Sequence, residues 1–72
     1  MTFGQRLKRI RFDRGISQRW LGREAGVTSG HMTFLEADKS VPSAAILERL
    51  AEVLGYTMDE LWKGTGRLGG FQ

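Results

Sequence analysis

The chemistry open to this chain is limited by a single histidine. His31 is the only histidine among the 72 residues, and cysteine is absent. Zinc sites in proteins are built from several Cys, His or carboxylate ligands, and no Cys or second His can join His31. A nucleophile paired with His31 would need an orienting carboxylate, and none stands at a convincing spacing. We therefore predict no enzyme, no metal site, no cofactor and no disulfide.

The segment "GTGRLG", residues 64–69, matches the dinucleotide-binding pattern G-x-G-x-x-G. That motif works only between a strand and a helix, with an acidic residue about 20 positions further on. Only Gly70, Phe71 and Gln72 follow it here. We interpret the match as accidental and predict two parts, a domain of residues 1–63 and a Gly-rich flexible tail of residues 64–72.

Helix-capping residues divide the chain into five short helices. Ser and Thr favour the N-cap position, and Gly often ends a helix in the left-handed conformation. Helix starts are expected at Thr2, Ser17, Thr28, Ser43 and Thr57. Helix ends are expected at Gly15, Gly26 and Gly55. No segment alternates as a strand would. The fold class is therefore expected to be all-α.

The second and third helices are about two turns each and are joined only by "GVT". Two short helices across a tight turn that contains Gly form a helix-turn-helix. Helices this short are marginal alone. We expect the apolar faces of the first and fourth helices to hold them in place.

Charge is distributed unevenly along the chain, whose net charge is +3. Residues 1–35 contain seven Lys or Arg against Asp13 and Glu24, whereas residues 36–72 carry a net charge of −2. A basic half beside an acidic half suggests one face for polyanions. An unevenly charged but functionless surface is the alternative. No apolar run approaches the ~20 residues of a membrane span, so we expect no membrane association.

Three segments together resemble the lambda-repressor/Cro-like helix-turn-helix family of phage and bacterial regulators. They are "RFDRGISQRWLGREAGV", "FLEADKSVPS" and "ILERLAEVLGYTMDELW". The resemblance runs from Phe3 to Lys63 and implies a compact five-helix DNA-binding domain. In such domains the third helix enters the major groove of double-stranded DNA while the second crosses the backbone. The resemblance thus implies a cytoplasmic, nucleoid-associated transcriptional regulator, with residues 28–37 as its recognition helix.

The resemblance also assigns roles to individual residues. Phosphate contacts are implied for Gln18 and for Thr28, the cap of the recognition helix. Arg11 and Glu36 match the structural ion pair of the family. The positions that face bases in relatives are Ser29, Gly30, Thr33 and Phe34, and the loop that follows the DNA backbone contains Lys39 and Ser40. His31 flanks the base-facing positions, where it either contacts DNA or is an ordinary solvated side chain.

Two positions depart from the family pattern. Asp38 stands where Gly is common, but Asp tolerates the left-handed conformation better than most residues. Gly22 stands where relatives usually have Ala. It either costs about 1 kcal/mol of helix propensity or permits unusually close helix packing.

The recognition surface itself lacks strong hydrogen-bonding readers. Arg and Lys read guanine and Asn and Gln read adenine, but none of them occurs between Thr28 and Ala37. Thr33 and Phe34 could press on a thymine methyl, and Ser or Thr hydroxyls accept either base. We therefore expect modest direct readout, with affinity supplied by phosphate contacts and DNA shape. Lys and Arg available for phosphates are Arg6, Arg9, Arg14, Arg19, Arg23 and Lys39.

A protein-interaction module on the same scaffold is the alternative function. Helical geometry points Phe12, Trp20 and Phe34 away from the core, and aromatic residues are enriched at protein interfaces. Scattered surface aromatics are also common in monomers. Relatives usually bind DNA as dimers, and we expect a homodimer through Leu61 and Trp62. Simple core closure is the other interpretation of these two residues.

Overall fold

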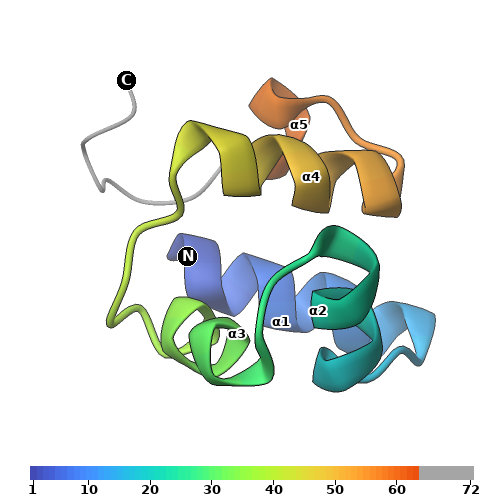
Figure 1. The fold of residues 1–72 in the computed structure, drawn as a ribbon. Coiled ribbons are helices and arrows are strands. Elements are labelled where there is room, and N and C mark those ends of the chain that lie inside the picture. The colour runs from blue at the N-terminus through green and yellow to red at the C-terminus, as the bar shows by residue number, and fades with distance from the viewer. Residues whose placement is uncertain (64–72) are drawn as a thin grey trace.

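The computed structural model describes residues 1–63, which form five α-helices and no strand (Figure 1). The helices are α1 (Phe3–Arg14), α2 (Gln18–Ala25), α3 (Ser29–Glu36), α4 (Ala44–Leu54) and α5 (Met58–Trp62). The expected all-α, five-helix fold is therefore confirmed. The predicted tail, residues 64–72, lies outside the described residues. None of the helices in residues 1–63 has the length and apolarity that crossing a bilayer requires.

Each helix begins at a Ser or Thr whose side chain accepts a hydrogen bond from the backbone N–H three residues later. These N-caps are Thr2, Ser17, Thr28, Ser43 and Thr57, as the sequence predicts. Two of these caps are capping boxes, in which Gln5 and Glu60 bond back to the backbone N–H of Thr2 and Thr57. This local bonding satisfies backbone donors that helix geometry leaves unpaired, and it fixes where each short helix starts.

The core lies where all five helices meet. Apolar side chains from every helix are buried there, and the largest that are almost fully buried are Phe3, Leu7, Leu21, Met32, Leu35, Leu47, Leu50 and Leu61. Helices α4 and α5 cover one side, at the top of Figure 1, and α1, α2 and α3 form the other. The inner side of α3 is thus packed into the core, whereas its outer side faces solvent.

Gly22 allows α2 and the turn that follows it to pack closely. A Cβ at this position would lie 2.6 Å from the Val27 carbonyl oxygen and 3.0 Å from Cγ of Met32. The Val27 N–H donates to the Gly22 carbonyl at 2.7 Å, which closes the turn. Of the two interpretations of Gly22, the structure supports close packing.

Asp38 connects the end of α3 to the start of α1. Its φ of 60° is the only positive value among the non-glycine residues described, as expected for this turn. Its carboxylate accepts hydrogen bonds from the Gly4 N–H at 2.9 Å and from the Thr2 hydroxyl. A Cβ on Gly4 would lie 2.5 Å from the Leu35 carbonyl oxygen, so Gly4 lets the two elements meet.

Candidate nucleic-acid interface

Helix α3 has a buried inner face and an exposed outer face. Met32 and Leu35 are fully buried, whereas the four positions expected to face bases, Ser29, Gly30, Thr33 and Phe34, are exposed. His31 is half-buried on the flank. The packing therefore leaves the outer face of α3 accessible along both turns of the helix.

The start of α3 presents unpaired donors. The Thr28 side chain accepts from the His31 N–H at 3.1 Å, and the Thr28 carbonyl accepts the first intrahelical bond from Met32 at 2.9 Å. The N–H groups of Ser29 and Gly30 precede that first bond, so helix geometry gives them no intrahelical partner. Together with the helix dipole, such N–H groups favour an anion.

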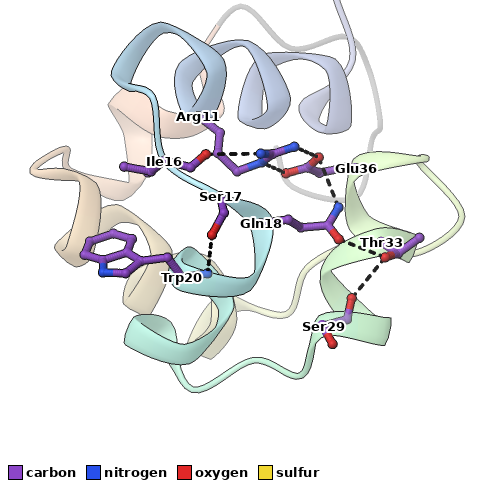
Figure 2. Close-up of polar contacts among 8 residues, drawn as sticks. All are labelled: Arg11, Ile16, Ser17, Gln18, Trp20, Ser29, Thr33 and Glu36. Atoms are coloured by element: carbon purple, nitrogen blue, oxygen red, sulfur yellow. Dashed lines mark hydrogen bonds and ion pairs between the residues drawn. The ribbon is translucent and has the colours of Figure 1, made fainter.

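A network of polar side chains joins the outer face of α3 to α1 and α2 (Figure 2). Arg11 donates to Glu36 from Nε at 2.7 Å and from Nη2 at 2.9 Å, and from Nη1 to the Ile16 carbonyl at 3.1 Å. The hydrogen bond to Glu36 raises the pKa of Arg11, burial opposes the rise, and the negative charge of Glu36 adds to it. The geometry of the two residues is that expected for the family's structural ion pair.

Gln18 continues this network towards the outer face. Its Nε2 donates to Oε1 of Glu36 at 3.3 Å, and its Oε1 accepts from the Thr33 hydroxyl at 3.0 Å (Figure 2). The same hydroxyl lies 3.0 Å from the Ser29 carbonyl oxygen. Two consequences follow. Thr33 turns its hydroxyl hydrogen inward, and Gln18 is oriented with one Nε2 hydrogen left for an outside acceptor.

Two of the six cations counted as available for phosphates are occupied elsewhere. Arg6 donates to the Leu61 and Glu60 carbonyls at 2.8 Å each, and Arg14 donates to the Leu54 carbonyl at 2.6 Å. Both guanidinium groups also lie near the Tyr56 ring, at 5.7 and 5.3 Å from its centroid. These two arginines therefore cap the C-terminal ends of α4 and α5, a role that their positions in the sequence do not reveal.

The remaining four cations differ in whether they have an intramolecular partner. Arg9 forms an exposed pair with Asp13 at 3.8 Å. Arg19, Arg23 and Lys39 are exposed and have no side-chain partner within residues 1–63. Lys39 follows Asp38 directly and is therefore held close to the end of α3, and the half-buried Ser40 comes next. The described part of the chain thus offers three unpaired cations on α2 and on the loop after α3.

The three aromatic residues of the alternative function are exposed, as expected, with exposed fractions of 63% for Phe12, 42% for Trp20 and 55% for Phe34. Phe12 nevertheless has intramolecular contacts, because the Arg11 guanidinium lies 4.8 Å and Lys8 Nζ 5.9 Å from its ring centroid. Its exposure therefore does not require a partner protein.

The expected dimer surface is corrected at one of its two residues. Leu61 is fully buried, so it has no surface to offer a second chain and instead closes the core. Trp62 is half-buried, and its ring stacks on Phe3 with 5.2 Å between centroids. Only Trp62 retains accessible surface for such a contact.

Residues 2–62 match the family model described as "Helix-turn-helix domain". The chain is 36% identical over 63 residues to an uncharacterized HTH-type transcriptional regulator, YonR, from the SPbeta prophage of Bacillus subtilis. It is 38% identical over 61 residues to the immunity repressor protein of Bacillus phage phi105. These matches cover 88% and 85% of this chain but only 58% and 42% of those proteins. The chain thus spans about half the length of these relatives.

Solved structures show the same arrangement of helices. The structure of the P22 c2 repressor in complex with synthetic operator 9T superposes with a TM-score of 0.81 at 28% identity. That match covers 89% of this chain and 97% of the other. The similarity extends over most of this chain. The family match to residues 2–62 includes α2, the turn and α3.

Proposed function

Because the chain belongs to the helix-turn-helix domain family, we propose that it is a DNA-binding transcriptional regulator whose α3 enters the major groove. One observation carries this proposal. The outer face of α3 is exposed over its whole length while its inner face is fully buried. The relatives named as a transcriptional regulator and a repressor support the same function. Such a regulator acts in the cytoplasm, at the nucleoid.

Phosphate contacts fix the position of the domain on the duplex. The Thr28 hydroxyl and the N–H groups at the start of α3 face one phosphate group, and the free Nε2 hydrogen of Gln18 donates to a neighbouring one. Lys39 and Ser40, in the loop after the C-terminal end of α3, lie along the sugar-phosphate backbone of the DNA. Hydrogen bonds to base edges come from the exposed Ser29 and the flanking His31, which gives the modest direct readout that the sequence predicts.

A dimer would place two copies of α3 in successive major grooves, about 34–36 Å apart. With Leu61 in the core, Trp62 is the remaining candidate from the last helix for contact between copies. Light scattering at tens of micromolar, with and without a duplex, tests this arrangement. A monomeric mass under both conditions would argue against the dimer and leave DNA binding by single domains.

Binding of a random-sequence duplex across a salt series tests the function. Each neutralised phosphate releases counterions, so the logarithm of the association constant falls linearly with the logarithm of salt concentration, by about 0.9 per phosphate. We expect tight binding at low salt and a clearly negative slope. A slope near zero would favour the protein-interaction module. In that case Phe34→Ala and Trp20→Ala would abolish partner binding, whereas Lys39→Ala would leave it intact.

A further inference from the structure

A groove of about 260 Å³ lies where the C-terminal half of α4 meets the start of α5. The residues that line this α4–α5 groove are Glu48, Ala51, Glu52, Tyr56, Thr57 and Met58. Pockets that enclose a drug-sized ligand usually have about 300–1,000 Å³. The groove is smaller than these pockets, so it suits a few side chains of another protein surface better than a small molecule.

The α4–α5 groove combines two exposed carboxylates with less polar residues beneath them. Glu48 and Glu52 lie one turn apart on α4, and neither side chain has a hydrogen-bond or ion-pair partner within residues 1–63. Ala51 is buried, and Tyr56 and Met58 are half-buried against the core. Such a surface is complementary to cations that stand beside a large apolar side chain.

Three cations near the α4–α5 groove do not line it. Arg6 and Arg14 lie over the Tyr56 ring and donate to backbone carbonyls at the ends of α4 and α5. Arg49 follows Glu48 in the chain, but helical geometry turns it by about 100°, and it forms no ion pair in the described part of the chain. The two carboxylates therefore remain available to a cation from outside.

Helix α2 carries a surface of the complementary kind, which we call the α2 patch. It consists of Arg19 and Arg23, both exposed and one turn apart, and Trp20, which is 42% exposed. Helical geometry places the three within an arc of about 100°, with the exposed Glu24 beyond Trp20. The centre of this arc lies about 150° from Gln18, whose side chain bonds to α3 (Figure 2). The α2 patch thus faces away from the recognition surface.

We propose that the α2 patch of one copy docks into the α4–α5 groove of a second copy. Arg19 and Arg23 have the same i,i+4 spacing as the two carboxylates, about 5–6 Å between Cβ atoms. Two ion pairs therefore form in register when α2 of one copy lies along α4 of the other. Trp20 then covers the less polar residues of the groove. Within residues 1–63 of one chain the two surfaces form no ion pair with each other, so each is open to a neighbouring copy.

The proposed contact joins two different surfaces, so each added copy leaves a groove free at one end and a patch at the other. This open-ended arrangement differs from a two-fold dimer through Trp62. Exposed ion pairs contribute little, and we expect a dissociation constant of about 0.1–1 mM at low salt. Little of the contact forms at tens of micromolar, so the light-scattering test of the dimer is not affected.

The contact itself is independent of the proposed DNA binding, because neither surface includes α3 or the loop after it. Its use would lie on DNA, where neighbouring sites hold copies at a high effective concentration. That use, unlike the contact, rests on the proposed function. The experiment is therefore carried out on the free protein.

Two complementary double variants separate the surfaces. Glu48→Gln/Glu52→Gln keeps the α2 patch and neutralises the groove, whereas Arg19→Gln/Arg23→Gln keeps the groove and neutralises the patch. Each variant alone should self-associate about tenfold more weakly than the wild type. An equimolar mixture should regain one contact, between the intact groove of one variant and the intact patch of the other. Circular dichroism melting verifies that both variants are folded.

Amide shifts locate this regained contact. When the ¹⁵N-labelled arginine variant is titrated to about 1 mM with the unlabelled glutamate variant, we expect shifts in residues 48–58 and little change in α2. With the labels exchanged, we expect shifts in residues 19–24 and little change in the groove. Raising the salt to about 1 M, where the Debye length is about 3 Å, should remove both sets of shifts.

Two exposed aromatic residues provide a matched pair of controls. Trp20→Ala, introduced into the variant that keeps the α2 patch, should weaken the mixed contact about tenfold, because the indole loses its burial in the groove. Phe12→Ala in the same variant removes an aromatic side chain that is 63% exposed and lies outside the patch, so it should leave the contact unchanged.

The inference is overturned if the mixture shows no shifts at about 1 mM, or if the shifts fall on α3 or around Trp62, since copies would then meet through other surfaces. Equal effects of Trp20→Ala and Phe12→Ala would also contradict it. Failure to bind any duplex would refute the proposed function and leave the contact standing. Loss of the contact would leave salt-dependent DNA binding unaffected.

Discussion

Arg11 and Glu36 are joined by two hydrogen bonds, with 2.7 Å from Nε to Oε2 and 2.9 Å from Nη2 to Oε1. Their side chains are only 10% and 5% exposed. The pair ties α1 to the last residue of α3 and reaches α2 through Gln18 at 3.3 Å. The placement of the recognition surface therefore depends on a nearly buried ion pair between two distant segments.

Removing one partner of this pair should destabilise the whole domain. Arg11→Ala leaves the Glu36 carboxylate buried without its cation, and we expect the free energy of unfolding to fall by about 3–5 kcal/mol. Urea denaturation followed by circular dichroism measures this change. Arg9→Ala is the matched control, because the Arg9–Asp13 pair is 3.8 Å apart and about 70% exposed. Such surface pairs contribute little, so an equal loss in both variants would contradict the structural role of Arg11.

The same substitution should have opposite effects at two glycines of the helix-turn-helix. Gly22→Ala places a Cβ 2.6 Å from the Val27 carbonyl oxygen, and overpacking of this kind costs about 1–3 kcal/mol. Gly30→Ala meets open space and should stabilise the domain by about 0.5–1 kcal/mol. Melting temperatures of the two variants check the prediction. Shifts of the same sign would show that the packing around one of these glycines differs from that described.

Asp38 has two separable roles, and substitutions should rank accordingly. Asn keeps an acceptor for the Gly4 N–H and tolerates positive φ, Gly keeps only the backbone freedom, and Ala keeps neither. We expect stability to fall in the order Asp, Asn, Gly, Ala, with about 1 kcal/mol between Gly and Ala. Thermal unfolding of the four proteins provides the measurement. If Asp38→Gly matched or exceeded the wild type, the carboxylate could not be an important cap of α1.

Cations tied to helix ends and cations that are free should affect DNA binding differently. Lys39→Ala should leave the melting temperature unchanged and make the salt slope shallower by about 0.9, the share of one phosphate. Arg6→Ala removes hydrogen bonds to the Glu60 and Leu61 carbonyls, so it should lower stability by about 1 kcal/mol and leave the slope unchanged. A slope that changes for Arg6 and stays constant for Lys39 would mean that the duplex lies on another face.

The sequence predicts what depends on neighbours along the chain. Caps such as Thr28 act on residues three positions away, and the periodicity of Met32 and Leu35 marks the inner face of α3, so both follow from spacing alone. The contact from Arg14 to the Leu54 carbonyl spans 40 residues and needs the packed fold. Asp38 shows the same limit. Its left-handed backbone follows from its residue type and the turn, whereas the hydrogen bond from the Gly4 N–H to its carboxylate spans 34 residues and does not.

Family resemblance supplied the pairing of Arg11 with Glu36, which spacing alone could not give. It did not show how the side chain at each base-facing position is hydrogen-bonded or how much space surrounds it. That Thr33 turns its hydroxyl inward and that Gly30 borders open space depend on side-chain packing, and both features decide what the surface can recognise. The choice between a dimer contact and core closure for Leu61 has the same origin, because a helix of five residues does not show from its pattern which side is buried.

Backbone amide shifts during titration with a duplex selected from a random-sequence library test the central claim most directly. The ¹⁵N-labelled chain is small enough for every described amide to be followed. We predict that the largest shifts fall on residues 28–34, on Gln18 and on the loop of residues 37–41, and that amides of α4 that face away from these segments stay unchanged. Shifts concentrated on α4 and α5, or none in residues 28–34 at saturation, would contradict an α3 that enters the groove.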